Sequence, residues 1–163
     1  MLSHLLTAAA TTHRTPRAAW VLGLMNVSLL PWFAAAVWFA EDTGLWVRLS
    51  IAYEALTLGF LGGVRCGFAF AAKDRLATQS DYATAITLPL VGWIALIPQP
   101  LAGGAILMAG FLMSALWDVA GVRSGALPAW YGRLRLQFLA PMIVFLAIVM
   151  ARIVAVDGPF GAG

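Results

Sequence analysis

Residues 46–72 read WVRLSIAYEALTLGFLGGVRCGFAFAA, a run of 27 residues in which only Arg48, Glu54 and Arg65 are charged. An α-helix rises about 1.5 Å per residue, so about 20 apolar residues are enough to cross the hydrocarbon core of a bilayer. The run is bounded on its C-terminal side by the charged residues 73–75. It therefore predicts a transmembrane helix with room to tilt.

The composition of the whole chain agrees with this prediction. Hydrophobic residues make up 62% of the 163 residues and charged residues 10%, whereas a soluble domain has roughly half apolar and about a quarter charged residues. The composition excludes a soluble globular domain and indicates an integral membrane protein. The single cysteine excludes a disulfide scaffold. A net charge of +3 without a basic run gives no support for nucleic-acid binding.

Apolar segments of suitable length recur along the chain, so we expect an all-α integral membrane protein, a bundle of five transmembrane helices. The third and fourth segments are joined by Pro98, Gln99 and Pro100, a turn short enough to make them an antiparallel hairpin. Residues 1–17 would form an N-terminal arm and residues 157–163 a short C-terminal tail on the opposite side. The five segments are expected at about 18–40, 46–72, 82–97, 101–117 and 138–156.

The distribution of basic residues between alternate loops predicts the orientation. One side collects seven basic residues and the other two, which predicts a cytoplasmic N-terminus. The Arg-rich, Ala-rich and Lys-poor composition suggests a bacterial source, so we expect the bacterial inner membrane. Residues 1–17 also have the composition of an organellar import sequence, so a bacterial and an organellar source both stay open. The seven are Arg14, Arg17, Lys73, Arg75, Arg123, Arg133 and Arg135, and the two are Arg48 and Arg152.

The second segment carries small residues on one face. Gly59, Gly63 and Gly67 recur every fourth residue and form a narrow stripe. Small residues at this spacing let the backbone of another helix approach closely. We expect the stripe to pack against a neighbouring helix, in preference to lining a substrate passage.

The same segment holds two ionisable side chains, Glu54 and Arg65, about 16 Å apart along the helix axis. An ionisable residue within a membrane is a candidate functional site by default. Glu54 leans toward the outer interface and can reach it, whereas Arg65 leans away from cytoplasmic water and needs an internal partner. A carboxylate, helix-end carbonyls or a lipid phosphate could serve, with Asp118 one candidate; ion or substrate coupling is the alternative.

The loop expected between the fourth and fifth segments combines an acid with arginines and aromatic residues: Asp118, Arg123, Trp130, Tyr131, Arg133 and Arg135. We expect a cytoplasmic cap in which Asp118 pairs with one arginine and the other arginines contact lipid phosphates. A docking surface for another protein is the alternative, because aromatic residues and arginine are enriched at interfaces.

The sequence contains no pattern that indicates an active site or a cofactor site. His4 and His13 both lie in the N-terminal arm, and Cys66 stands alone, so haem ligation and a metal site inside the bundle lack their ligands. No catalytic motif is present. We expect a protein that is not an enzyme and that holds no cofactor, although a bound lipid is possible.

Four stretches together resemble an uncharacterised multi-pass family of bacterial inner membranes, domain of unknown function 3429, which includes the mitochondrial transmembrane protein 69 group. They are YEALTLGFLGGVRCG (53–67), PLVGWIALIP (89–98), FLMSALWD (111–118) and LPAWYGRLR (127–135), and the resemblance covers about residues 18–155. Cys66 stands where the family usually has tryptophan, and Glu54 where it has a small residue. The resemblance implies a small five-helix membrane protein, no established activity, and motif positions at Gly62, Gly63, Arg65, Asp118, Trp130, Tyr131, Arg133 and Arg135.

Two classes of function fit these observations. The first is a non-enzymatic accessory or assembly subunit of a larger membrane complex, for example a respiratory or photosynthetic one. The second is a small transporter or channel that uses Glu54 and Arg65. Transport usually requires a broken helix with polar groups converging near the midplane, often within a repeat. The sequence shows no repeat, so the accessory role is favoured.

Overall fold

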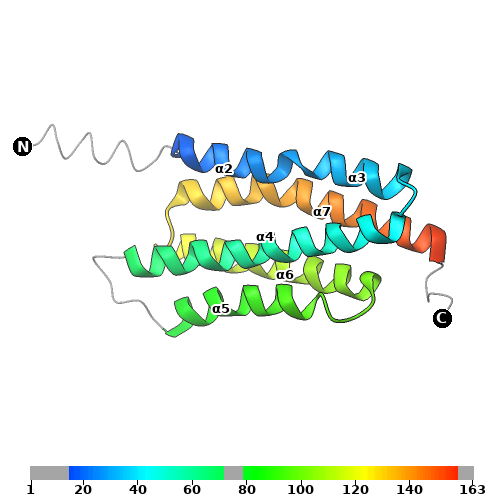
Figure 1. Cartoon of the computed structure of the whole chain (residues 1–163). Coiled ribbons are helices and arrows are strands. Elements are labelled where there is room, and N and C mark those ends of the chain that lie inside the picture. The colour runs from blue at the N-terminus through cyan, green and yellow to red at the C-terminus, as the bar shows by residue number, and fades with distance from the viewer. Residues whose placement is uncertain (1–14, 72–78, 158–163) are drawn as a thin grey trace, which may run out of the picture.

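The computed structural model describes residues 15–71 and 79–157, which form a bundle of antiparallel α-helices without a strand (Figure 1). The expected all-α fold is confirmed. Of the expected terminal segments, residues 1–14 and 158–163 lie outside the described part of the chain, as do residues 72–78.

Five helical rods make up the bundle, and the first of them consists of two helices, α2 and α3. Four rods, the first at Arg17–Phe39, are long and apolar enough to cross a membrane, and a shorter apolar helix covers Tyr82–Ile94. The chain is therefore a multi-pass membrane protein. The helices are α2 (Arg17–Ser28), α3 (Leu30–Phe39), α4 (Thr43–Ala71), α5 (Gln79–Ile94), α6 (Pro100–Arg123) and α7 (Ala129–Asp157).

The connections between successive rods lie at alternate ends of the bundle. The start of α2 and the α6–α7 turn lie at one end, on the left in Figure 1, which we call the N-terminal end. The α3–α4 and α5–α6 turns lie at the opposite end. This arrangement agrees with the alternation expected for five spans.

Helices α6 and α7 extend further toward the N-terminal end than the hydropathy predicts. α6 continues to Arg123 instead of ending near residue 117, and α7 begins at Ala129 instead of residue 138. The turn between them contains Gly125 at φ 75°, a left-handed conformation that glycine adopts without steric cost. Trp130, Tyr131, Arg133 and Arg135 are consequently helical residues, and the expected long loop is wrong.

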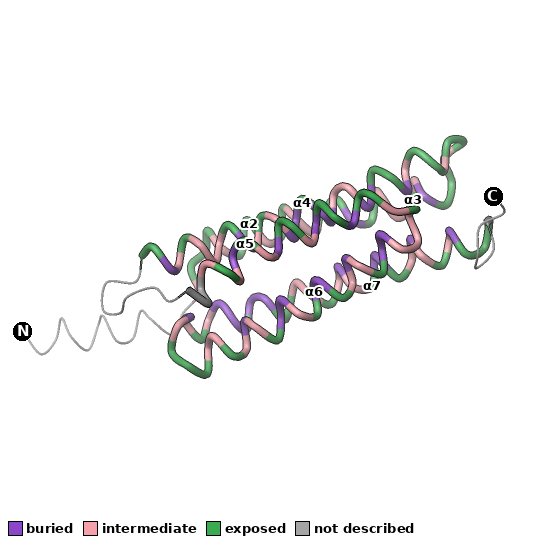
Figure 2. The backbone as a smooth tube through the Cα atoms, turned by 90° about the horizontal axis from the view of Figure 1, so that it is seen from below, coloured by how far each residue is buried: buried purple, intermediate pink, exposed green. Residues whose placement is uncertain are grey.

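Helix α4 is the centre of the bundle, because it packs against α3, α5, α6 and α7. The core around it contains Leu58, Leu107, Phe111, Leu146 and Val149, each fully buried. Buried positions recur along α3 to α7, so each of these helices has one face in the core and one facing outward, whereas α2 has no fully buried residue (Figure 2). Many of the exposed residues are large and apolar, which suits contact with lipid chains.

The backbones of α4 and α5 approach closely at Gly62. A Cβ atom there would lie 2.4 Å from the carbonyl oxygen of Ala85 and 2.6 Å from Cδ of Pro89. Only the absence of a side chain allows the two backbones to come this close.

The expected glycine stripe is therefore only partly correct. Gly59 makes an ordinary contact with Pro89, 3.8 Å from the position of an added Cβ. Gly63 and Gly67 are exposed, and an added Cβ at either would meet nothing within 4 Å. The prediction that these two pack inside the bundle is wrong, because α5 meets the adjacent face that carries Gly62, about 100° around the helix.

Candidate functional site

Three charged side chains from three helices meet at the N-terminal end of the bundle. Arg65 of α4 places its Nε 2.8 Å from Oδ1 of Asp118 on α6, and Arg135 of α7 places its Nε 3.1 Å from Oδ2 of the same carboxylate. Arg135 also donates from Nη2 to the Ser114 hydroxyl at 2.8 Å. We call these four residues the Asp118 cluster.

The Asp118 cluster is almost completely removed from solvent. The side chains of Arg65, Asp118 and Arg135 are 10%, 4% and 3% exposed. Breaking such a buried pair by removing one partner is strongly destabilising, because an uncompensated charge is left behind. The cluster therefore ties α4, α6 and α7 together at one point.

Two sequence expectations meet at this cluster. The expected polar partner for Arg65 is confirmed, and it is the candidate carboxylate, Asp118. The expected cap, with Asp118 paired to a single arginine, is wrong, because both carboxylate oxygens are engaged by different arginines. The side chain of Arg135 faces the core because α7 begins at Ala129, so that Arg135 is a helical residue on the buried face of α7.

The other expected loop residues separate onto different faces of α7. Tyr131 is buried, with its ring 5.0 Å from that of Phe68, and Trp130 is half-buried at 6.2 Å from the same ring. Arg133 is exposed. Tyr131 and Arg135 are thus unavailable for docking or lipid contact, and that part of the prediction is wrong. For Trp130 and Arg133 it stays a prediction.

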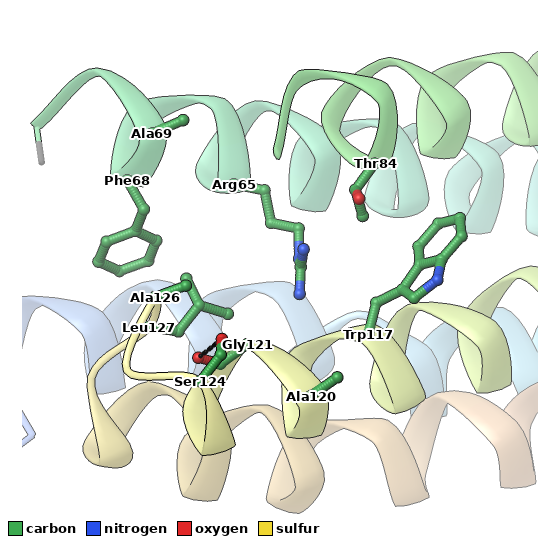
Figure 3. Close-up of a pocket in the computed structure, with 10 residues that line it drawn as sticks. All are labelled: Arg65, Phe68, Ala69, Thr84, Trp117, Ala120, Gly121, Ser124, Ala126 and Leu127. Atoms are coloured by element: carbon green, nitrogen blue, oxygen red, sulfur yellow. Dashed lines mark hydrogen bonds between the residues drawn. The ribbon is translucent and has the colours of Figure 1, made fainter. Parts of the chain in front are cut away.

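A cavity of about 340 Å³ opens beside the cluster, between α4, α5, α6 and the α6–α7 turn (Figure 3). The Arg65 side chain reaches from α4 into this space, with Phe68 and Leu127 to one side and Trp117 to the other. Nη2 of Arg65 is buried and has no hydrogen-bond partner.

Glu54 lies deeper in the bundle and is fully buried. Neither carboxylate oxygen has a hydrogen-bond partner. The charge of Arg135 acts on Glu54 electrostatically. The expectation that Glu54 reaches the outer interface is wrong, because the central position of α4 turns this face into the core.

A polar link between α2 and α4 was not anticipated from the sequence. Nδ2 of Asn26 donates to Oγ1 of Thr57 at 3.3 Å, and the Tyr53 hydroxyl donates to the backbone carbonyl of Asn26. Asn26 and Thr57 also line an apolar cavity of about 180 Å³ between α2, α4 and α7. The available signal was an asparagine within an otherwise apolar span.

Among the side chains described, those of residues 15–71 and 82–157, no three of histidine, cysteine or acidic type lie close enough together to hold a metal ion. Cys66 is a free, half-buried thiol in this part of the chain.

Comparison with known proteins gives a family. No curated protein and no solved structure matches the chain. The model of a family described as "Protein of unknown function (DUF3429)" matches residues 15–151, which include all of helices α2 to α6 and most of α7. The chain therefore belongs to the DUF3429 family, the family that its sequence motifs resemble.

Proposed function

We propose that this protein is a non-enzymatic accessory or assembly subunit of a larger membrane complex, such as a respiratory or photosynthetic one. The observation that carries the proposal is an outward face of α4 with the pattern of a helix-packing surface. Its occupant would be a transmembrane helix of another subunit.

Five residues form this face, which we call the α4 seam: Leu56, Phe60, Gly63, Gly67 and Phe70. Their spacing alternates between four and three residues, which is the spacing of one helix's contacts in a coiled coil. Leu56, Phe60 and Phe70 are 74%, 57% and 73% exposed. The two glycines lie between the phenylalanines and form a notch, because an added Cβ at either would meet no atom of the described chain within 4 Å.

The notch favours a helix over lipid as the occupant. Glycine in a helix costs about 1 kcal/mol relative to alanine, and a disordered acyl chain gains nothing from the missing methyl group. A partner helix does gain, because small residues allow close backbone approach, the main source of packing energy in a bilayer.

The test is native electrophoresis of membranes solubilised in a mild detergent, with the partners identified by mass spectrometry. Gly63→Leu and Gly67→Leu should each release the protein from a high-mass complex. Ala109→Leu, at an exposed position of α6, is the control and should leave the complex intact. A chain that migrates as a monomer in wild type, or Gly63→Leu and Gly67→Leu chains that stay in the complex, would contradict the proposal.

Glu54 supports the alternative, a small transporter or channel. A fully buried carboxyl without a hydrogen-bond partner is typical of proton pathways in membranes. Arg65 supports this alternative less well, because Asp118 already engages its Nε. Purified protein in liposomes distinguishes the two: proton flux that Glu54→Gln abolishes would favour transport, and no flux would favour the accessory role.

We also propose that the N-terminal end of the bundle faces the cytoplasm in a bacterial inner membrane. Arg17 and the exposed Arg123 and Arg133 support this orientation, because they lie at that end. A reporter that fluoresces only in the cytoplasm, fused at residue 163, should stay dark in bacteria. Fluorescence from that fusion would place the C-terminus in the cytoplasm and contradict the proposed orientation.

A further inference from the structure

The cavity beside Arg65 has a charged side chain in its wall. It is open space of about 340 Å³ between the last turns of α4 and α6 and the start of α5. Its lining is otherwise mostly small or apolar, with Trp117, Ala120 and Leu127 among its residues. Arg65 is 10% exposed and extends into it (Figure 3).

The guanidinium of Arg65 has a hydrogen-bond donor without an acceptor. Its Nε donates to Oδ1 of Asp118 at 2.8 Å, but its Nη2 is buried without an acceptor. Asp118 does not supply one: its Oδ1 accepts from Nε of Arg65 and its Oδ2 from Nε of Arg135, and neither accepts from Nη2. A buried donor left unsatisfied destabilises the fold by the cost of removing it from water, and a charged donor costs more than a neutral one.

Among the side chains that the structure describes, those near the cavity carry a net positive charge, which favours an anion. Arg65 and Arg135 contribute two positive charges, and Asp118 contributes one negative charge between them. Arg135 also interacts electrostatically with Glu54, but the oxygens of Glu54 accept no hydrogen bond from either arginine. Arg65 is the charged residue that lines the cavity, and the rest of the positively charged cluster lies directly behind it.

We propose that this cavity binds the phosphate group of an anionic ligand, with one phosphate oxygen accepting a hydrogen bond from Nη2 of Arg65. Arginine suits phosphate because its planar donors match the phosphate oxygens. Arg65 lies six residues before the end of α4, about 9 Å along the axis, close to the depth of lipid headgroups. The phosphate could therefore belong to a phospholipid headgroup or be free in solution.

Two variants test the site from different directions. Arg65→Gln removes the donor and its charge but leaves the Asp118–Arg135 pair. Ala120→Leu partly fills the cavity from an exposed position in its wall and leaves all of the cluster side chains in place. Ala109→Leu, the same change at an exposed position of α6 outside the cavity, is the matched control.

The measurement is made on the full-length protein purified in dodecyl maltoside. Native mass spectrometry counts retained phosphatidylglycerol against diacylglycerol, a lipid without a phosphate group. In a second arm, thermal stability is followed with sodium phosphate against sodium chloride at equal ionic strength. Loss of one charged hydrogen bond should weaken phosphate binding at least about tenfold in Arg65→Gln. Ala120→Leu should bind less and Ala109→Leu as wild type.

Each outcome decides the proposal. Retention of phosphatidylglycerol that depends on Arg65 and Ala120 supports it and identifies a lipid headgroup as the source. Stabilisation by sodium phosphate with the same dependence supports it and identifies free phosphate. No preference for phosphatidylglycerol and no phosphate effect, or binding that both variants leave unchanged, would overturn it. If Arg65→Gln fails to fold, Ala120→Leu against Ala109→Leu decides.

Discussion

Two adjacent glycines of α4 should respond in opposite ways to the same added methyl group. Gly62→Ala places a Cβ 2.4 Å from the Ala85 carbonyl oxygen, and Gly63→Ala places one where nothing lies within 4 Å. Cβ atoms in proteins essentially never lie closer than 3.0 Å to a heavy atom of a residue that is not a neighbour in the chain. Since the obstacle at Gly62 is backbone, relief requires α5 to move away from α4.

The expected energies follow from these two environments. Overpacking typically costs about 1–3 kcal/mol, and alanine recovers up to about 1 kcal/mol of helix propensity. Because the obstacle at Gly62 is backbone, the cost should lie in the upper part of this range, about 2–3 kcal/mol. Gly62→Ala should therefore lower the free energy of unfolding by about 1–2 kcal/mol net. Gly63→Ala gains only the propensity and should raise stability by about 0.5–1 kcal/mol.

The assay is reversible unfolding of the purified protein in mixed micelles of dodecyl maltoside and dodecyl sulfate, followed by circular dichroism. Wild type, Gly62→Ala and Gly63→Ala are compared at the same protein concentration, without partner proteins. If Gly62→Ala is as stable as wild type, or if both changes destabilise equally, the α4–α5 contact described above is wrong.

Two further predictions concern the buried acids. Asp118→Asn leaves Arg65 and Arg135 without a carboxylate and should lower the free energy of unfolding by about 3–5 kcal/mol in the same assay. Arg123→Gln, at an exposed position, is the control. An Asp118→Asn protein as stable as this control would contradict the buried pairing. Glu54→Met replaces a buried, unpartnered carboxyl with an apolar side chain and should add about 1–3 kcal/mol to the free energy of unfolding, whereas a loss of stability would mean that the carboxyl has a partner.

The spans and the helical class could be predicted from the sequence because hydropathy acts residue by residue. The partner of Arg65 could be anticipated for a related reason: a charge inside hydrocarbon must be compensated, and Asp118 is an acid at the same end of the bundle. The structure adds the Ser114 contact and the second arginine, which no local pattern in the sequence indicates.

The start of α7 and the packing glycine could not be predicted in this way. Arg133 and Arg135 lower the mean hydropathy of residues 129–137, so the segment resembles a loop. A hydropathy scale gives every arginine the same value and takes no account of the Asp118 carboxylate that pairs with Arg135. The glycine stripe indicates a face suited to close packing, but the choice between Gly62 and Gly63 depends on where α5 lies, which is a tertiary property.

The contact of Gly62 with α5 also bears on how the chain enters the membrane. Pro89 has no amide hydrogen, so the carbonyl of Ala85, four residues earlier, loses the donor that a regular helix supplies. This is the carbonyl that lies over Gly62, where the α-carbon of the glycine can cover it and keep it from lipid. With 16 residues and one carbonyl that lacks its regular helical donor, α5 is a poor candidate for insertion alone. We expect α4 and α5 to partition into the bilayer together, as a preassembled hairpin.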